Sequence, residues 1–247
     1  MNTIETKNLT KKYKDKTAVD SLNLTIKEGE LFSLLGVNGA GKTTTIRMLA
    51  CLSTPTAGEA FVNGNDCIKE AGEVKKIIGI SPQDTAVADN LTVRENLEFM
   101  AAIYYTDKDK IKERINEIES VFGLIEVENQ RAKTLSGGWK RKLSIAMALI
   151  SKPKVLFLDE PTLGLDVLAR RELWRAIENL KGKMTIVLTT HDMEEAEHLS
   201  DRIAIMLSGK IVACGTLDEI EKAAGKEGKG LEEAFVTIAE SGVPVSE

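Results

Sequence analysis

A glycine-rich segment early in the chain has the residue types and the spacing of a phosphate site. Residues 36–43 read GVNGAGKT and satisfy the pattern G-x-x-x-x-G-K-[ST]. The glycines let backbone amides wrap phosphate oxygens, Lys42 can reach the outer phosphates, and the Thr43 hydroxyl can ligate Mg²⁺. A glycine turn can spell this pattern by chance. The preceding buried run and the following helical pattern favour the phosphate site.

A second glycine-led segment lies in the middle of the chain. Residues 134–150 read TLSGGWKRKLSIAMALI, with Ser136, Gly137 and Gly138 directly before an apolar-striped helical pattern. A helix start exposes backbone N–H groups and the positive end of the macrodipole, where an anion is favoured. The sequence therefore predicts two anion cradles in one chain.

Two neighbouring acids end another apolar run, VLFLDE, at residues 155–160. At the carboxyl end of a buried strand, Asp159 would belong to the Mg²⁺ shell, and Glu160 would orient or deprotonate a water molecule. The alternative is that the two acids only cap the next helix. The glycine loop upstream favours the catalytic interpretation.

The elements that must position these groups follow from hydrophobic periodicity. Leu22, Leu24 and Ile26 alternate with polar residues and predict a half-buried strand. Nearly continuous apolar runs predict strands buried on both faces, at residues 31–36, 77–82, 155–161 and 184–191. Because a helical stretch separates the last two, we expect a parallel sheet with crossover connections.

The middle and the end of the chain have a different pattern. Residues 91–150 contain no convincing strand, and apolar residues recur at helical spacing, namely Ile111, Ile115, Ile118 and Phe122, then Leu143, Met147 and Ile150. These residues predict an all-helical insertion in an α/β core. From residue 217 we expect two short helical stretches around GKEGKG (225–230), which is interpreted as a flexible linker.

Charge and cysteine content exclude several classes of function. A net charge of −5 and a pI near 5.4 argue against nucleic-acid binding. The basic clusters 140–142 and 75–76 are interpreted as solvated helix faces. Cys51, Cys67 and Cys214 are distant in sequence and odd in number, which favours neither a disulfide framework nor a zinc site and fits a reducing cytosol. No apolar run reaches the ~18 residues of a bilayer span, so we expect a soluble, intracellular chain.

Taken in order, these motifs resemble those of the ATP-binding cassette (ABC) family, the ATPase subunits of ABC transporters. The resemblance covers almost the whole chain. Further positions match motif residues of the family: Tyr13 the aromatic that stacks on adenine, Gln83 the glutamine that touches Mg²⁺ and the attacking water, and His191 the histidine that senses the γ-phosphate. Residues 135–138 match the family signature, and residues 164–166 match the loop that crosses to a partner subunit.

The resemblance implies a single ABC ATPase domain over residues 1–247. Its fold is α/β, a P-loop NTPase core with a parallel sheet, an antiparallel β subdomain, an all-helical subdomain at about 84–150 and a helical tail at 217–247. The implied cofactors are ATP and Mg²⁺. The residues implied in nucleotide binding are Tyr13, Gly36, Val37, Asn38, Gly39, Ala40, Gly41, Lys42, Thr43, Thr44, Ser136, Gly137, Gly138 and Asp166; in catalysis Gln83, Glu160 and His191; and in metal binding Thr43, Gln83 and Asp159.

The same resemblance explains why one chain carries two anion cradles. In the family, the signature of one subunit caps the γ-phosphate held by the loop of the other, so a two-fold dimer buries two ATP molecules. It implies a second ATPase subunit, as a homodimer or with an unlike partner, and a separate membrane permease. The chain would then lie on the cytoplasmic face of the membrane, and its motifs look most like those of exporters of drugs, lipids or polysaccharides.

Two questions stay open on the sequence. Trp139 stands where the signature usually continues with a polar residue, so either the main-chain amides suffice or the site is slow. A soluble ABC ATPase of a non-transport assembly machine is the alternative to a transporter subunit. A small-molecule kinase would leave the signature, Gln83 and His191 unexplained together.

Overall fold

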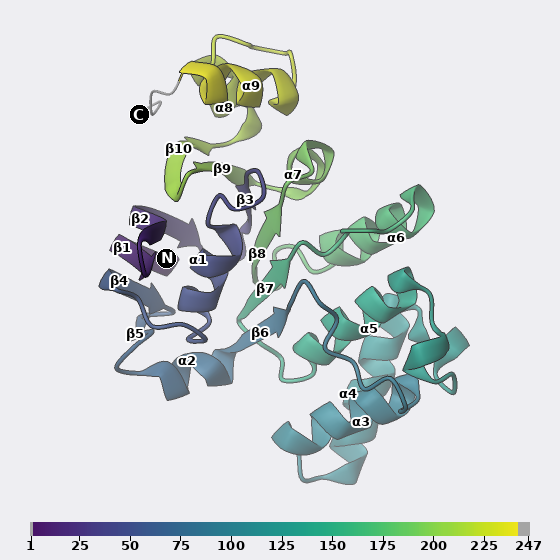
Figure 1. The fold of residues 1–247 in the computed structure, drawn as a ribbon. Helices are drawn as coiled ribbons and strands as arrows, with labels where there is room; N and C mark the ends of the chain where they lie inside the picture. The colour runs from purple at the N-terminus through teal and green to yellow at the C-terminus, as the bar shows by residue number, and fades with distance from the viewer. Residues whose placement is uncertain (1, 242–247) are drawn as a thin grey trace. The chain divides into compact units, whose positions relative to one another are not determined.

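The computed structural model describes residues 2–241, which form two compact units (Figure 1). The first unit contains the chain up to Lys75 and again from Lys181 onward, and the second contains Lys76–Leu180. Helix α2 (Ala71–Ile77) runs across the boundary between them. The expected helical tail at 217–247 is described up to residue 241, and its last six residues lie outside the described part.

The first unit begins with an antiparallel sheet in the order β2-β1-β4-β5. Inward-facing side chains such as Ile4, Leu9 and Ile26 are fully buried. Leu22, Leu24 and Ile26 alternate with exposed neighbours, which confirms the predicted half-buried strand. The strands are β1 (Asn2–Tyr13), β2 (Lys16–Lys27), β4 (Ala57–Val62) and β5 (Asn65–Asp66).

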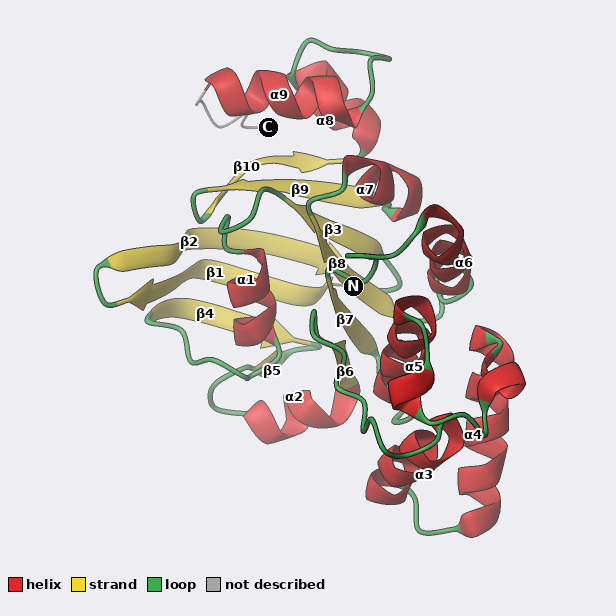
Figure 2. Ribbon diagram, turned by 45° about the vertical axis from the view of Figure 1, so that its right-hand side comes forward, coloured by secondary structure: helices red, strands yellow, loops and turns green. Residues whose placement is uncertain are grey.

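The same unit holds a group of buried parallel strands. Strand β3 (Leu31–Leu35) is parallel to β8 (Thr185–Thr190) on one side and to β9 (Arg202–Leu207) on the other. Every residue of β3 and β8 is buried, as the continuous apolar runs predict. Strand β10 (Lys210–Gly215) adds antiparallel to β9. Helix α1 (Lys42–Leu49) contacts β2 and β4 of the antiparallel sheet and also β8, and so packs between the two sheets (Figure 2).

Three helices complete the first unit: α7 (Met193–Leu199), α8 (Leu217–Ala223) and α9 (Leu231–Ser241). Buried residues of α7, α8 and α9 share one apolar cluster with β9 and β10. The interpretation of residues 225–230 as a flexible linker is wrong. The buried Glu221 carboxylate accepts hydrogen bonds from the Gly228 and Gly230 amides, both at 2.7 Å, and so fixes the connection between α8 and α9.

The second unit combines two strands with a group of helices. Strands β6 (Ile78–Ser81) and β7 (Val155–Asp159) are parallel, as expected, although β6 starts one residue late because Ile77 ends α2. The helices are α3 (Val93–Tyr104), α4 (Lys108–Phe122), α5 (Gly137–Leu149) and α6 (Val167–Glu178), with 3₁₀ turns at Leu124–Val127 and Ala132–Thr134. Within residues 91–150, all of them described, the β-type pairing is limited to one isolated bridge.

Helix α5 differs from the amphipathic helix that its sequence predicts. Leu143, Met147 and Ile150 are buried, but so is every residue from Arg141 to Leu149. A Cβ built on Gly79 of β6 would lie 2.3 Å from the Ala148 carbonyl oxygen, so this strand and this helix are in close contact. The helix is therefore the centre of the second unit and not a surface helix.

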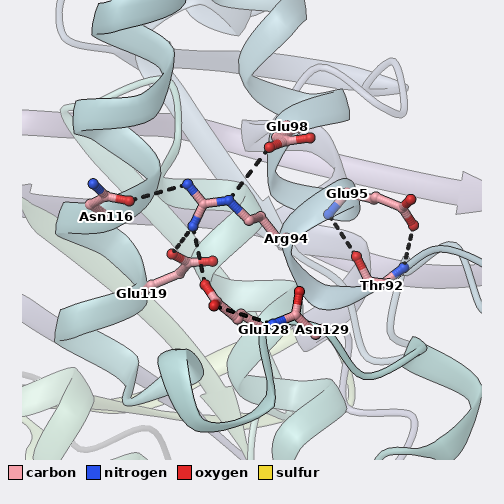
Figure 3. Close-up of polar contacts among 8 residues, drawn as sticks. All are labelled: Thr92, Arg94, Glu95, Glu98, Asn116, Glu119, Glu128 and Asn129. Carbon is pink, nitrogen blue, oxygen red and sulfur yellow. Dashed lines mark hydrogen bonds and ion pairs between the residues drawn. The ribbon is translucent and has the colours of Figure 1, made fainter.

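A partly buried ionic network links α3 to α4 (Figure 3). The Arg94 guanidinium donates to Glu119 at 2.8 Å, Glu128 at 3.2 Å and Asn116 at 3.3 Å. Burial raises the pKa of Glu119, whose side chain is almost fully enclosed, although the Arg94 charge acts in the opposite direction. The network therefore supplies polar contacts between the two helices.

Candidate functional site

The first unit carries the predicted phosphate loop between β3 and α1. At two of its positions, neighbouring backbone atoms leave no room for a side chain. A Cβ at Gly36 would lie 2.3 Å from the Met206 carbonyl oxygen, and one at Gly41 would lie 2.4 Å from that of Ala18. Gly41 also has φ +110°, a left-handed conformation that side chains disfavour. The loop therefore follows a backbone path that only glycine permits at these positions.

The charged and hydroxyl groups of the loop lie at the start of α1. Lys42 is 5% exposed, and its Nζ donates to the Gly36 carbonyl at 2.5 Å and the Val37 carbonyl at 3.3 Å. Because the helix has neither an acidic residue in its first turn nor a side-chain cap, its positive end stays available to an anion. Val37, Asn38 and Gly39 are exposed, whereas Gly36, Ala40 and Lys42 are buried and Gly41, Thr43 and Thr44 are half-buried.

Two other predicted residues of the first unit, His191 and Tyr13, belong to segments that adjoin this loop. The Gly36 amide donates to the Thr190 carbonyl at 3.2 Å, so the end of β8, and His191 directly after it, adjoins the loop. Tyr13 pairs with Lys16 at the tip of the β1–β2 hairpin, and Lys16 lies two residues before Ala18, whose carbonyl oxygen closely approaches Gly41. The Tyr13 ring is 47% exposed, with the Lys11 ammonium 5.1 Å from its centroid. Its open face can stack on a base.

The second unit carries the second cradle at the start of α5. Ser136 is the N-cap, and its Oγ accepts from the Trp139 amide at 3.5 Å. This capping leaves the Gly137 and Gly138 amides outside the hydrogen-bond ladder of the helix. Ser136 and Gly137 are exposed and Gly138 is half-buried. The end of the helix therefore presents two amides and a hydroxyl on an open surface.

The signature glycines also make a packing contact with the start of α6. A Cβ at Gly138 would lie 3.0 Å from the Ala169 Cβ, which is too tight without a shift, whereas one at Gly137 would meet the Leu165 Cδ2 at 3.7 Å. Asp166 caps α6 by accepting from the Leu168 amide at 2.9 Å and the Ala169 amide at 3.0 Å. The second unit thus brings together the signature and the predicted crossing loop at residues 164–166.

A residue that sequence reasoning missed holds the Gln83 segment. The Arg141 guanidinium donates to the Pro82 carbonyl at 2.7 Å and to the Gln83 carbonyl at 2.6 Å. Arg141 is 5% exposed and Lys142 is 9% exposed, so the interpretation of residues 140–142 as a solvated face is wrong. Gln83 itself is exposed. The sequence offered one indication of this role, because Arg141 lies in the helix that directly follows the signature.

The two acids lie at the end of β7, as predicted. Asp159 is the last residue of the strand and is 5% exposed, and Glu160 follows it at 6%. Glu160 has φ +47°, a conformation that a residue with a side chain adopts at a cost. Residues 161–164 form a run of turns before α6, and the Leu163 amide donates to the Glu160 carbonyl at 3.2 Å. The turns hold Glu160 in this unusual conformation.

The Trp139 side chain turns toward its own helix. The Lys142 ammonium lies 4.5 Å from the centroid of the indole ring and 2.8 Å from a Glu172 carboxylate oxygen. The indole therefore contacts a lysine of the next turn, and the main-chain amide of Trp139 remains in its capping bond to Ser136.

A glycine loop at the carboxyl end of a buried parallel strand, with a buried lysine at the following helix start, defines the class of P-loop nucleotide-binding proteins. The ABC transporter family model matches residues 19–163. The chain belongs to the ABC transporter family and is an ATP-binding, ATP-hydrolysing cassette of that family.

Known proteins of similar sequence agree with this assignment. The chain is 40% identical over 216 residues to the daunorubicin resistance ATP-binding protein DrrA3 of Streptomyces coeruleorubidus, covering 87% of this chain and 68% of that protein. It is 45% identical over 217 residues to the human phospholipid-transporting ATPase ABCA3, covering 86% of this chain. The chain spans only 13% of the length of ABCA3.

Solved structures share the fold. The ATP binding subunit of an ABC transporter superposes with a TM-score of 0.85 at 30% identity, covering 96% of this chain and 99% of that one. A dimeric, post-hydrolysis structure of the cassette MJ0796 bound to ADP and Pi gives 0.79 at 29% identity, covering 87% and 98%. Within residues 2–241, no helix combines the length and the apolar character of a membrane span.

Proposed function

We propose that this chain is the motor subunit of an exporter: two copies close on two ATP molecules and drive a separate membrane permease. The observation that carries the proposal is the phosphate loop, in which the close approaches at Gly36 and Gly41 and the buried Lys42 form a pre-shaped anion site. Such a site binds phosphates with main-chain amides and one ammonium group, at little reorganisation cost.

The proposed nucleotide and metal contacts use the donor types present at each position. Tyr13 stacks on the base, residues 36–44 hold the phosphates, and oxygen ligands for Mg²⁺ come from Thr43, Asp159 and Gln83. A hydroxyl, a carboxylate and an amide oxygen fit a hard cation that shares its ligands with phosphates. Bound there, Mg²⁺ would neutralise charge on the transferred phosphoryl group.

Glu160 is the proposed general base, and Gln83 and His191 orient the water and sense the γ-phosphate. The low exposure of Glu160 and the turns that hold it support this role, because a catalytic carboxylate must be fixed in position. A general base typically contributes roughly 10²–10⁴-fold to the rate. Turnover should therefore depend on this side chain more than on any other.

The second cradle is proposed to act on the nucleotide of a second copy. Ser136, Gly137, Gly138 and Asp166 lie together in the second unit, and the cassette MJ0796 is described as dimeric in a state bound to ADP and Pi. A homodimer makes the contact reciprocal. The relatives named for daunorubicin resistance and phospholipid transport support export from the cytoplasmic face of a membrane, with the permease as the anchor.

Replacing Glu160 by Gln tests this function. We expect ATP binding to persist, hydrolysis to fall by roughly 10²–10⁴-fold, and a nucleotide-bound dimer to accumulate, because closure no longer ends in bond cleavage. Glu172→Gln, an exposed carboxylate on α6, is the matched control and should hydrolyse normally. Turnover and size-exclusion chromatography with ATP measure both effects, and unchanged hydrolysis in Glu160→Gln would remove this residue from catalysis.

The alternative, an ATPase of a non-transport assembly machine, makes a different prediction about the partner. Detergent-solubilised membranes from the native cell should yield a multi-span permease with the tagged Glu160→Gln chain and ATP. Recovery of soluble partners alone would favour the assembly machine, without affecting the test of ATP hydrolysis.

A further inference from the structure

Two cysteines that are distant in sequence meet in the first unit. Cys51 follows the end of α1, and Cys67 follows β5. Their thiols both donate to the Leu49 carbonyl oxygen, at 3.9 Å from the Cys51 sulfur and 3.5 Å from the Cys67 sulfur. The two sulfur atoms therefore converge on one carbonyl at the end of the helix that carries Lys42.

The two thiols have different environments. Cys67 is 4% exposed, whereas Cys51 is half-buried and can be reached by a small reagent. The neighbouring Cys67 thiol lowers the pKa of Cys51, and the nearby Lys75 charge acts in the same direction. The neighbouring Cys51 sulfur and burial both raise the pKa of Cys67. One sulfur is thus the better nucleophile, and the other is a sheltered thiol beside it.

We propose that Cys51 and Cys67 form a reversible intramolecular disulfide, with Cys51 as the reacting thiol and Cys67 as the resolving thiol. The oxidant is a small disulfide such as oxidised glutathione. The Cys51 thiolate attacks one sulfur and expels the first small thiolate, which leaves a mixed disulfide on Cys51. Cys67 then loses its proton, attacks the Cys51 sulfur and expels the second thiolate. The protein loses two electrons and two protons, and the oxidant becomes two thiols.

The bond would join covalently two segments that are now linked by the weak hydrogen bond from the Cys67 thiol to the Leu49 carbonyl. Helix α1 ends at Leu49, Cys51 has φ +57°, and the Cys67 amide donates to the Ala60 carbonyl of β4 at 2.9 Å. Oxidation would therefore tie the C-terminal end of the phosphate-loop helix to the antiparallel sheet. The pairing itself rests on the convergence of the two thiols and not on the proposed transport function.

The test is oxidation of the full-length chain in graded glutathione buffers, followed by alkylation and peptide mass spectrometry without reduction. We expect one species in which the peptides of Cys51 and Cys67 are joined with loss of two hydrogens. Glutathione on Cys51 should stay below about a tenth of the oxidised product, because the neighbouring thiol reacts at high effective concentration. Oxidation that links two chains, or glutathione on Cys51 as the main product, would overturn the proposal.

Variants of the three cysteines sharpen the result. Cys67→Ser should raise the glutathione on Cys51 at least about tenfold, and Cys51→Ser should leave Cys67 unmodified. Cys214→Ser is the matched control, because Cys214 lies in β10, where its sulfur contacts the Arg202 guanidinium at 3.4 Å, and it should leave the pairing unchanged. Dibromobimane, which becomes fluorescent after bridging two thiols, tests reduced wild-type protein directly, and absence of a Cys51–Cys67 crosslink would contradict the proposal.

Discussion

The phosphate loop and the signature are both glycine-led helix starts, yet they are built differently. In the loop, Gly36 and Gly41 are required because neighbouring carbonyl groups approach within 2.3 and 2.4 Å of the Cβ positions. In the signature, the tight contact is between Gly138 and Ala169 of the next helix. The first set of glycines shapes the backbone around a ligand, and the second lets two helices approach.

The lysines near the two cradles also differ in the groups that they contact. Lys42 is buried, and its ammonium bonds to carbonyl groups of the loop itself. The lysines beside the signature are turned to carboxylates, Lys140 to Asp89 at 2.9 Å and Lys142 to Glu172 at 2.8 Å. An anion at the signature would meet amides, a hydroxyl and a helix dipole, which are weak alone in water. We infer that the loop binds a nucleotide by itself, and that the signature acts only once a second chain brings a phosphate to it.

The largest effect is expected on ATP binding when the lysine of the phosphate loop is replaced and the lysine beside the signature serves as the control. Lys42→Ala should weaken ATP binding to the isolated subunit by about 1.5–3 kcal/mol, or roughly 10- to 150-fold, because it removes charge-assisted hydrogen bonds to phosphate. Lys140→Ala, which removes a lysine from the first turn of the signature helix, is the matched control and should bind ATP normally. Equilibrium dialysis measures both, and equal losses would break the comparison.

A packing change should reveal the structural role of Gly138. Gly138→Ala should lower the free energy of unfolding by about 1–3 kcal/mol, since the new methyl group overlaps the Ala169 side chain. Gly137→Ala meets its nearest neighbour at an ordinary distance and should change stability little. Urea denaturation measures both. Rescue of Gly138→Ala by Ala169→Gly would assign the loss to this contact, and failure of rescue would place its cause elsewhere.

The Ser136 hydroxyl should matter for turnover and not for binding to one subunit. Ser136→Ala should lower the ATP hydrolysis rate about tenfold, the value of one hydrogen bond of ~1.4 kcal/mol, while ATP affinity of the monomer stays unchanged. Loss of its cap on α5 should also cost about 1 kcal/mol of stability. Thr92→Ala removes a cap from α3 and controls for that loss. Weaker monomer binding in Ser136→Ala alone would mean that the cradle acts within its own chain.

The smallest effect is expected at Trp139. Trp139→Gln removes the contact between the indole and Lys142 but keeps the amide that caps with Ser136, so hydrolysis should change less than about threefold. Steady-state turnover at saturating ATP measures it. A rise of an order of magnitude would instead mean that the tryptophan makes this signature slow.

Much of the fold was predictable because it depends on local pattern. The runs at 31–36, 155–161 and 184–191 became buried parallel strands, and the region 91–150 became helices, since periodicity reports directly on burial. The apolar stripe predicted on α5 covers only part of the buried surface of this helix. Its other faces are covered by elements distant in sequence. The loop at 225–230 was misread for the same reason, as its anchor is the side chain of Glu221.

The sequence alone determined the phosphate loop, the two acids after β7 and the membership in the ABC family, because these depend on residue type at fixed spacing. The tertiary structure decided which residues support them: Arg141 at the Gln83 segment, Ala169 against Gly138, and Cys67 beside Cys51. Each of these pairs joins residues far apart along the chain. Local pattern carries no information about such contacts, since they form only when the elements pack together.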